Sequence, residues 1–157
     1  MTGLRRFLVL IALMFWQGGF TFYVSVVVPL ATEVLGSPLR QGFITRPVTW
    51  WLNVIASIAL TILLWDTLGC KAAIRFRKWS RLGLWLAMAI IQGCLFGLHG
   101  TLSAMMVEKG RILSDPDRFY VIHRIYLWLH TAQWLGNLLW MGLMLAAWRK
   151  EDRTPQE

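Results

Sequence analysis

Three histidines are the side chains of this sequence best suited to bind a cofactor or to carry a proton. His99 lies in one long apolar stretch, and His123 and His130 lie seven residues apart in another. Seven residues make about two helical turns, so a helix would place His123 and His130 on nearly the same face. Three interpretations fit these rings: a cofactor site, a proton path, and polar packing between helices.

The elements that must position these rings are long apolar stretches. Of the 157 residues, 57% are hydrophobic and ten are tryptophan, which is more than a soluble domain of this length carries. Four stretches reach the roughly 20 residues that a helix needs to cross a hydrocarbon core of about 30 Å. The sequence therefore predicts an all-α fold, a four-helix transmembrane bundle, in which residues 1–157 form a single integral membrane domain. We expect helices at about residues 7–30, 48–68, 82–107 and 116–149, and a polar, disordered tail at 151–157.

The first apolar stretch raises the alternative of a cleaved signal peptide, because Arg5 and Arg6 precede it. The stretch continues beyond the roughly 15 residues of a signal-peptide core, and no A-x-A cleavage site follows it. A retained helix is the better interpretation.

The placement of the basic residues predicts an orientation. The net charge is +8, and ten of the sixteen Lys and Arg residues fall on one side of the predicted membrane. Cytoplasmic segments carry the excess of Lys and Arg, so we expect both termini and the segment between the second and third helices in the cytoplasm. The segment Lys71–Arg81 is expected to hold anionic lipid headgroups. This clustering argues against a nucleic-acid partner. The ten residues are Arg5, Arg6, Lys71, Arg75, Arg77, Lys78, Arg81, Arg149, Lys150 and Arg153.

Proline follows a capping residue at two predicted helix starts. Ser37-Pro38 predicts a cap and first turn of a short external helix, and Asp115-Pro116 predicts the start of the fourth long helix. Pro47 is expected to begin the second long helix.

Polar side chains inside the apolar stretches form two predicted levels. At about 1.5 Å per residue, one level lies about 27–28 Å from the nearest cytoplasmic basic residue and the other about 15–18 Å. Intramembrane polar groups usually face the interior of a bundle. The outer level holds Ser25, Asn53, His99 and His130, and the level near mid-membrane holds Gln17, Thr61, Gln92 and Asn137.

His99 and His130 share the outer level on antiparallel helices, so they are predicted to face each other, with His123 above the membrane. Such a pair fits the axial ligands of haem b. It also fits a copper site, with Met105 or Met106 nearby. Interhelical hydrogen bonding, and a path for a proton or a small solute, are the alternatives.

The sequence offers no interior carboxylate to work with these histidines. Asp66 is predicted at the cytoplasmic end of the second helix, and Glu33 and Glu108 in or near external loops. No acid–base pair or nucleophile triad can be assigned, so we do not expect an enzyme. A proton-coupled transporter is also less favoured, because it needs an ionisable relay.

The third apolar stretch carries a small-residue face. Gly93, Gly97 and Gly100 stand on one side of a helix, where they would let another helix approach closely. The pattern predicts packing, either within the bundle or in a homo-oligomer or larger membrane complex. Cys94, beside this face, is expected to be buried.

Two segments resemble the first and last helices of small four-helix bacterial integral membrane proteins, a family with a domain of unknown function that is distantly like a TMEM-type eukaryotic group. The segments are Trp16–Pro29, WQGGFTFYVSVVVP, and Phe119–Leu139, FYVIHRIYLWLHTAQWLGNLL. The likeness rests on an apolar helix that runs from glycine to proline, and on Phe119, His123 and Asn137. It implies a four-helix fold and a multi-pass protein of a bacterial inner membrane, and it implies no activity.

Three functions therefore remain open from the sequence. The first is a non-catalytic or accessory integral membrane protein. The second is a haem- or metal-binding electron-transfer module that uses His99 and His130. The third is a small-solute carrier that uses the two polar levels. The first is preferred, because no motif demands chemistry.

Overall fold

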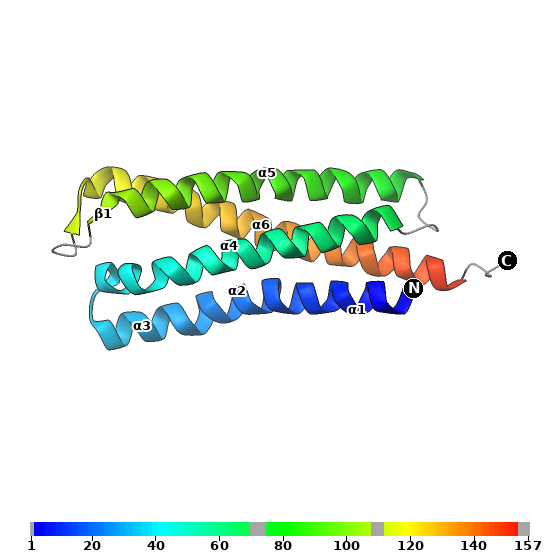
Figure 1. The fold of residues 1–157 in the computed structure, drawn as a ribbon, viewed down its shortest axis with the longest axis horizontal. Helices are drawn as coiled ribbons and strands as arrows, with labels where there is room; N and C mark the ends of the chain where they lie inside the picture. The colour runs from blue at the N-terminus through cyan, green and yellow to red at the C-terminus, as the bar shows by residue number, and fades with distance from the viewer. Residues whose placement is uncertain (1, 70–74, 108–111, 154–157) are drawn as a thin grey trace.

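The computed structural model describes residues 2–69, 75–107 and 112–153, and nearly all of these residues are helical. Four long helical segments lie side by side (Figure 1). The predicted all-α fold is confirmed. The elements are α1 (Thr2–Leu13), η1 (Met14–Gly18), α2 (Gly19–Phe22), η2 (Tyr23–Val27), α3 (Val28–Leu35), α4 (Pro38–Gly69), α5 (Arg75–Met105), β1 (Met106–Val107), β2 (Ile112–Leu113) and α6 (Pro116–Arg153).

Three of the helical segments are long and apolar enough to cross a membrane. They are Gly3–Leu35, Leu39–Gly69 and Lys78–Met105, with 33, 31 and 28 residues. The fourth, α6, has 38 residues but carries polar side chains along its middle. The prediction of a membrane protein is supported by three helices.

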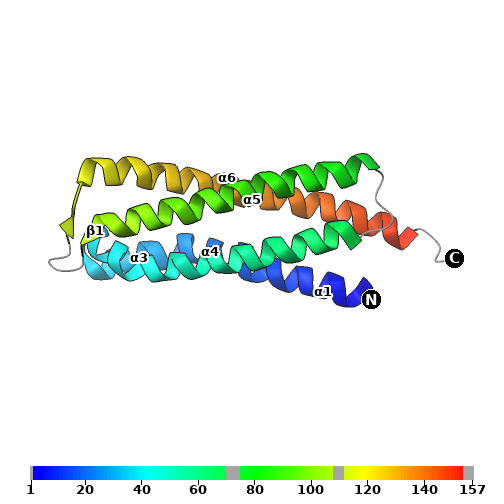
Figure 2. The same cartoon turned by 45° about the horizontal axis from the view of Figure 1, so that its top comes forward.

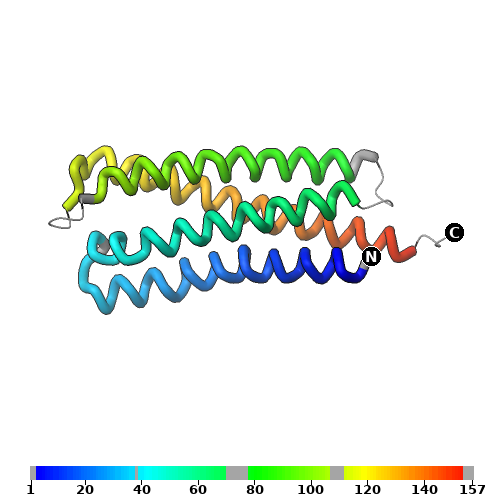
Figure 3. The backbone as a smooth tube through the Cα atoms, in the orientation of Figure 1, coloured from blue at the N-terminus to red at the C-terminus, as the bar shows by residue number. Residues whose placement is uncertain are grey.

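The segment from α1 to α3 is one continuous helical path, interrupted by two π-helical turns (Figure 3). The second turn, η2, ends just before Pro29. Proline cannot donate a backbone hydrogen bond, and its ring clashes with the carbonyl of residue i−4, which here is Ser25. A wider π turn over Ser25 relieves that clash. The same turn directs Tyr23 toward the other helices, where it is buried.

The connection from α3 to α4 is tight, and it begins where the sequence places it. Gly36 has φ 61°, the left-handed conformation that glycine adopts most easily at a helix C-terminus. Ser37 precedes Pro38, the first residue of α4, as predicted. Pro47, however, does not begin a helix. It lies inside α4, so the expected short helix and second long helix form a single element.

The last two long helices extend beyond their predicted bounds. α5 begins at Arg75 and not near residue 82, and α6 continues to Arg153. Residues 151–153 were assigned to a disordered tail, and this assignment is wrong; residues 154–157 lie outside the described part of the chain. The predicted start of α6 is confirmed, because the Arg118 amide donates to Asp115 Oδ1 at 3.1 Å.

The two ends of the fold differ. The beginning of α1 and the end of α6 lie at one end, which we call the terminal end (Figure 2). The α3–α4 turn and the antiparallel pair β1–β2 lie at the opposite end, which we call the hairpin end. Chain direction therefore alternates between the four helical segments, as the predicted topology requires.

The apolar core runs along the centre of the terminal half and joins all four helical segments. α5 packs between α4 and α6, and α1 packs against α4. Trp140, Leu63 and Val9 are fully buried at its centre. A second apolar cluster joins α5 to α6 nearer the hairpin end, and contains Leu95, Leu102 and Tyr126.

Candidate functional site

A cavity of about 340 Å³ lies among the helices at the hairpin end, and all three histidines line it. We call it the histidine cavity. Most of the side chains around it are apolar or aromatic. His99 and His130 were predicted to face each other, and the structure places both on the wall of this cavity. His123 lines the same cavity, and its predicted place above the membrane stays a prediction.

His99 comes from α5 and is tied to α4. Its Nε2 lies 3.2 Å from the carbonyl oxygen of Arg46. Because a carbonyl oxygen only accepts, His99 Nε2 must carry a proton to make this contact. The ring also lies 5.8 Å from that of Trp50 and 6.5 Å from that of Tyr126.

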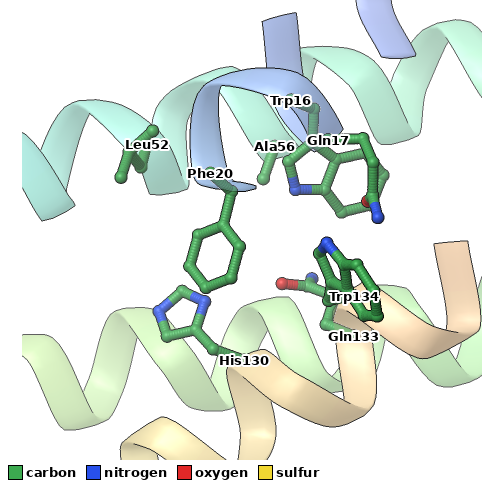
Figure 4. A pocket seen from close by; sticks show the side chains of 8 residues that line it. All are labelled: Trp16, Gln17, Phe20, Leu52, Ala56, His130, Gln133 and Trp134. Carbon is green, nitrogen blue, oxygen red and sulfur yellow. The ribbon is translucent and has the colours of Figure 1, made fainter. Parts of the chain in front are cut away.

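His130 comes from α6 and lies between two aromatic rings. Phe20 of α2 stacks on it, with ring centroids 5.0 Å apart and an interplanar angle of 20°. Figure 4 shows this stack at close range, with Gln133 and Trp134 further along the same helix. Tyr126 meets the His130 ring edge-on at 4.5 Å. These contacts fix the plane of the imidazole without using its nitrogens.

His123 lies two turns before His130 and repeats the same arrangement. Its ring stacks on Phe119, with centroids 5.7 Å apart and an interplanar angle of 7°. Burial lowers the pKa of His123, because the cavity wall disfavours the charged ring.

The mouth of the histidine cavity is on the outer surface of the fold. Val24 of η2, together with Tyr120 and Leu127 of α6, lines the cavity and is also exposed. The mouth therefore lies between the N-terminal helical segment and α6. Its rim is apolar and aromatic.

Beside the cavity, amide side chains from three helices form a buried chain of hydrogen bonds. Gln133 of α6 donates to Gln92 of α5 at 2.8 Å, and Gln92 donates to the Asn53 carbonyl oxygen of α4 at 3.1 Å. Asn53 in turn donates to the Tyr126 hydroxyl at 3.2 Å. Tyr126 therefore connects this chain to the cavity wall. Neither Tyr126 nor Gln133 was among the predicted site residues.

A second polar contact joins the first and last helical segments. Asn137 donates to Gln17 Oε1 at 2.8 Å. Within the described residues, Gln17 Nε2 and Asn137 Oδ1 are buried without a hydrogen-bond partner. Gln17 also lines a small cavity of about 10 Å³, together with His130 and Gln133 (Figure 4).

The predicted division into two polar levels is wrong in part. Asn53 was assigned to the outer level and Gln92 to the middle, yet they hydrogen-bond to each other. Ser25 and Thr61 were expected inside, but both are exposed. Each instead donates to the carbonyl four residues earlier in its own helix, Thr21 and Ser57. A hydroxyl satisfied in this way can face lipid, so its type alone does not reveal its direction.

An ionic cluster that the sequence did not predict closes the terminal end. Asp66 is fully buried, and it pairs with Arg81 at 2.5 Å and with Arg5 at 3.0 Å. The Trp148 indole also donates to Asp66, at 3.2 Å. Arg81 lies over the Trp140 ring, 4.8 Å from its centroid. The sequence signal that could have indicated this cluster was Asp66, an acidic residue at the end of an apolar helix, near several arginines.

The same cluster extends to the end of α6. Arg5 and Arg6 both bind Glu151, at 2.6 and 3.1 Å, and Arg6 also binds Asp152 at 2.7 Å. Arg5, Arg6, Asp66, Arg81, Glu151 and Asp152 together form what we call the terminal cluster.

The terminal cluster changes the prediction for the basic segment Lys71–Arg81. Arg81 is fully buried in an ion pair, so it cannot meet a lipid headgroup. The side chains of residues 71–77 lie outside the described part, so lipid binding there stays a prediction.

The glycine face of α5 does not pack inside the fold. A Cβ atom added at Gly93, Gly97 or Gly100 would meet no described atom within 4 Å. All three glycines are exposed, and so is Cys94, which was expected to be buried. The close approach predicted within the bundle is therefore made at Gly136 of α6, which lies against Met88.

Within the described residues, no group of three or more His, Cys, Asp or Glu side chains is placed to hold a metal ion. The three histidines share a cavity but do not converge on one point. Comparison with known protein families, curated proteins and solved structures finds no match for this chain.

Proposed function

We propose that this chain is a multi-pass integral membrane protein, in which α6 crosses the bilayer together with the three apolar helices. The support is the length of α6 and its uncharged stretch at residues 125–148, which lies beside the other three. Its polar side chains Gln133 and Asn137 are buried against neighbouring helices, so they need not meet lipid.

We propose further that the terminal end faces the cytoplasm. Labelling of a single cysteine at position 114, at the opposite end, tests this orientation. The support is the excess of basic residues at that end. In a background with Cys70→Ser and Cys94→Ser, a Ser114→Cys variant should react with an impermeant maleimide added outside intact cells. Reaction only after the cells are opened would reverse the orientation.

For activity, we propose a non-catalytic protein that binds a small, membrane-soluble molecule in the histidine cavity. The observation that carries this proposal is the cavity itself: about 340 Å³, largely apolar walls, and three histidines. Ligand sites typically have about 300–1,000 Å³ and combine apolar walls with a few placed polar groups.

Gly42 provides a test of this function, because it lines the cavity. A Cβ at Gly42 would lie 3.3 Å from the flexible end of Met106, so Gly42→Leu should fold and partly fill the space. Gly83→Leu is the matched control, since Gly83 is exposed with nothing within 4 Å. Native mass spectrometry of protein released from membranes should show a retained small molecule with the wild type and Gly83→Leu, and less with Gly42→Leu. Equal retention, or none in the wild type, would contradict the proposal.

A haem- or copper-binding function is the second candidate, because His99 and His130 line one cavity. A metal at His99 Nε2 would have to replace its hydrogen bond to the Arg46 carbonyl. An absorption spectrum before and after reduction, with elemental analysis, distinguishes this function from binding of an organic molecule. A small-solute carrier has less support, since a mostly apolar wall cannot satisfy many hydroxyl groups.

A further inference from the structure

The nitrogens of two cavity histidines have no partner in the described part of the chain. His123 and His130 make ring contacts, but neither hydrogen-bonds to another described residue. His99, in contrast, is bound to Arg46. A polar group at an apolar wall is costly unless it is hydrogen-bonded. Two oriented imidazoles on one cavity therefore point to a ligand that bonds with them.

The chemistry of a neutral imidazole narrows the ligand. One ring nitrogen donates a hydrogen bond and the other accepts one. A ketone oxygen matches the donor and a phenolic hydroxyl matches the acceptor. A ligand that changes between these two forms, as a quinone and its quinol do, can bond to the same ring in either form.

The shape of the wall favours a flat ring. Phe20 stacks on His130 and Phe119 stacks on His123. Tyr126 contacts the His130 ring edge-on. Aromatic rings prefer offset-stacked or edge-to-face contact with other rings. A planar headgroup would gain such contacts, which a flexible acyl chain would not.

The charge and polarity of the cavity wall argue against other classes of ligand. No carboxylate lines the cavity within the described residues, so an organic cation would find no counter-ion there. A sugar or an amino acid would leave many polar groups unsatisfied against the apolar wall. A fatty acid fits the apolar wall, and Arg46 also lines the cavity, but this ligand leaves the stacked rings unexplained.

The position of the mouth agrees with a ligand that arrives through the bilayer. Val24, Leu127 and Tyr120 form an exposed apolar rim. A long apolar tail attached to the ring would leave the cavity across this rim and lie along α6. A lipid-soluble quinone has this form.

We propose that the histidine cavity binds the headgroup of a membrane quinone or quinol, with His123 and His130 as its hydrogen-bond partners. This inference rests on the proposed small-molecule function and names its ligand. It concerns binding only; no electron transfer is assigned to the chain.

The test measures binding of decylubiquinone to the full-length protein in lipid nanodiscs, with palmitate as the comparison ligand. Binding should saturate at one quinone per chain. His123→Phe and His130→Phe keep an aromatic ring but remove the nitrogens, and each should weaken binding at least tenfold. Gly42→Leu should weaken it as much, while Gly83→Leu should leave it unchanged. Circular dichroism and size-exclusion chromatography establish that each variant is folded, and a conservative His130→Gln should restore part of the affinity.

The outcomes separate the two proposals. If palmitate binds in a manner sensitive to Gly42→Leu and the quinone does not bind, the quinone inference is wrong and the small-molecule function stands. If the quinone binds equally to wild type and both Phe variants, the histidines are not its partners and the inference fails. If neither ligand binds and Gly42→Leu retains the same small molecules as the wild type, both proposals fail.

Discussion

Arg81 donates to Asp66 at 2.5 Å, and both side chains are fully buried. They lie on consecutive helices, α4 and α5, and Arg5 of α1 completes the contact at 3.0 Å. With the Trp148 indole of α6, which also donates to Asp66, these contacts join all four helical segments at one point. A buried charge without its partner would be costly, so the ion pairs favour this arrangement of the helices.

Breaking this pair should strongly destabilise the fold. Asp66→Asn removes the charge that both arginines share, and we expect a loss of about 3–5 kcal/mol, as for other buried pairs that lose one partner. Replacing both residues, with Asp66→Leu and Arg81→Leu, should cost less than the sum of the single changes. Thermal unfolding in detergent measures the effect, and Arg118→Met, at an exposed position, is the control. Equal melting temperatures for Asp66→Asn and the wild type would show that the pair is not formed.

The outer part of the terminal cluster predicts a dependence on pH. Burial raises the pKa of Glu151, but the hydrogen bonds and charges of Arg5 and Arg6 outweigh it, so its pKa lies below the ordinary value of 4.5. A depressed pKa means that the contribution to stability is complete above pH 4.5 and is lost as the pH falls through the folded-state pKa. The melting temperature should therefore fall as the pH is lowered below 4.5. Glu151→Gln should lower stability at pH 7 and flatten this dependence; an unchanged slope would contradict it.

The amide chain beside the cavity should contribute to stability through Gln92. Gln92→Leu removes the hydrogen bonds that Gln92 makes with the Gln133 amide and the Asn53 carbonyl, which keep Met88 and Ser57 as their other partners. Each lost hydrogen bond should cost about 0.5–1.5 kcal/mol. Thr61→Val is the matched control: Thr61 is exposed and bonds only within its helix, so a change below about 0.5 kcal/mol is expected. Chemical denaturation of the two variants compares them. A Gln92→Leu protein as stable as the control would show that the chain is dispensable.

Two glycines should respond in opposite ways to the same substitution. Gly136→Leu meets Met88 and Leu84 inside the fold, so overpacking should cost about 1–3 kcal/mol. Gly97→Leu meets nothing within 4 Å, so the stability of the single chain should not change. Thermal unfolding with size determination in detergent separates the cases. A smaller oligomer for Gly97→Leu would assign the glycine face of α5 to contact between copies, whereas loss of stability in the monomer would contradict its position in the structure.

The sequence by itself determined the helices and much of their ends. Apolar stretches of sufficient length predict membrane helices whatever they contact, because a bilayer demands internally bonded backbone. The starts at Pro38 and Pro116 were also predictable, since capping is a local interaction. Pro47 was misassigned as a helix start because a proline inside a long helix can be tolerated when other helices support it.

The tertiary structure alone decided which polar side chains meet. Ser25 and Asn53 were given the same depth, yet one faces outward and the other is fully buried, because rotation about the helix axis and not depth sets direction. The rotation of α6 about its axis also places His123 on the cavity wall, where its ring stacks on Phe119. The Asp66–Arg81 pair depends on how α4 and α5 pack. Such contacts between helices have no local sequence signal, since any helix of the same composition can pack at several rotations.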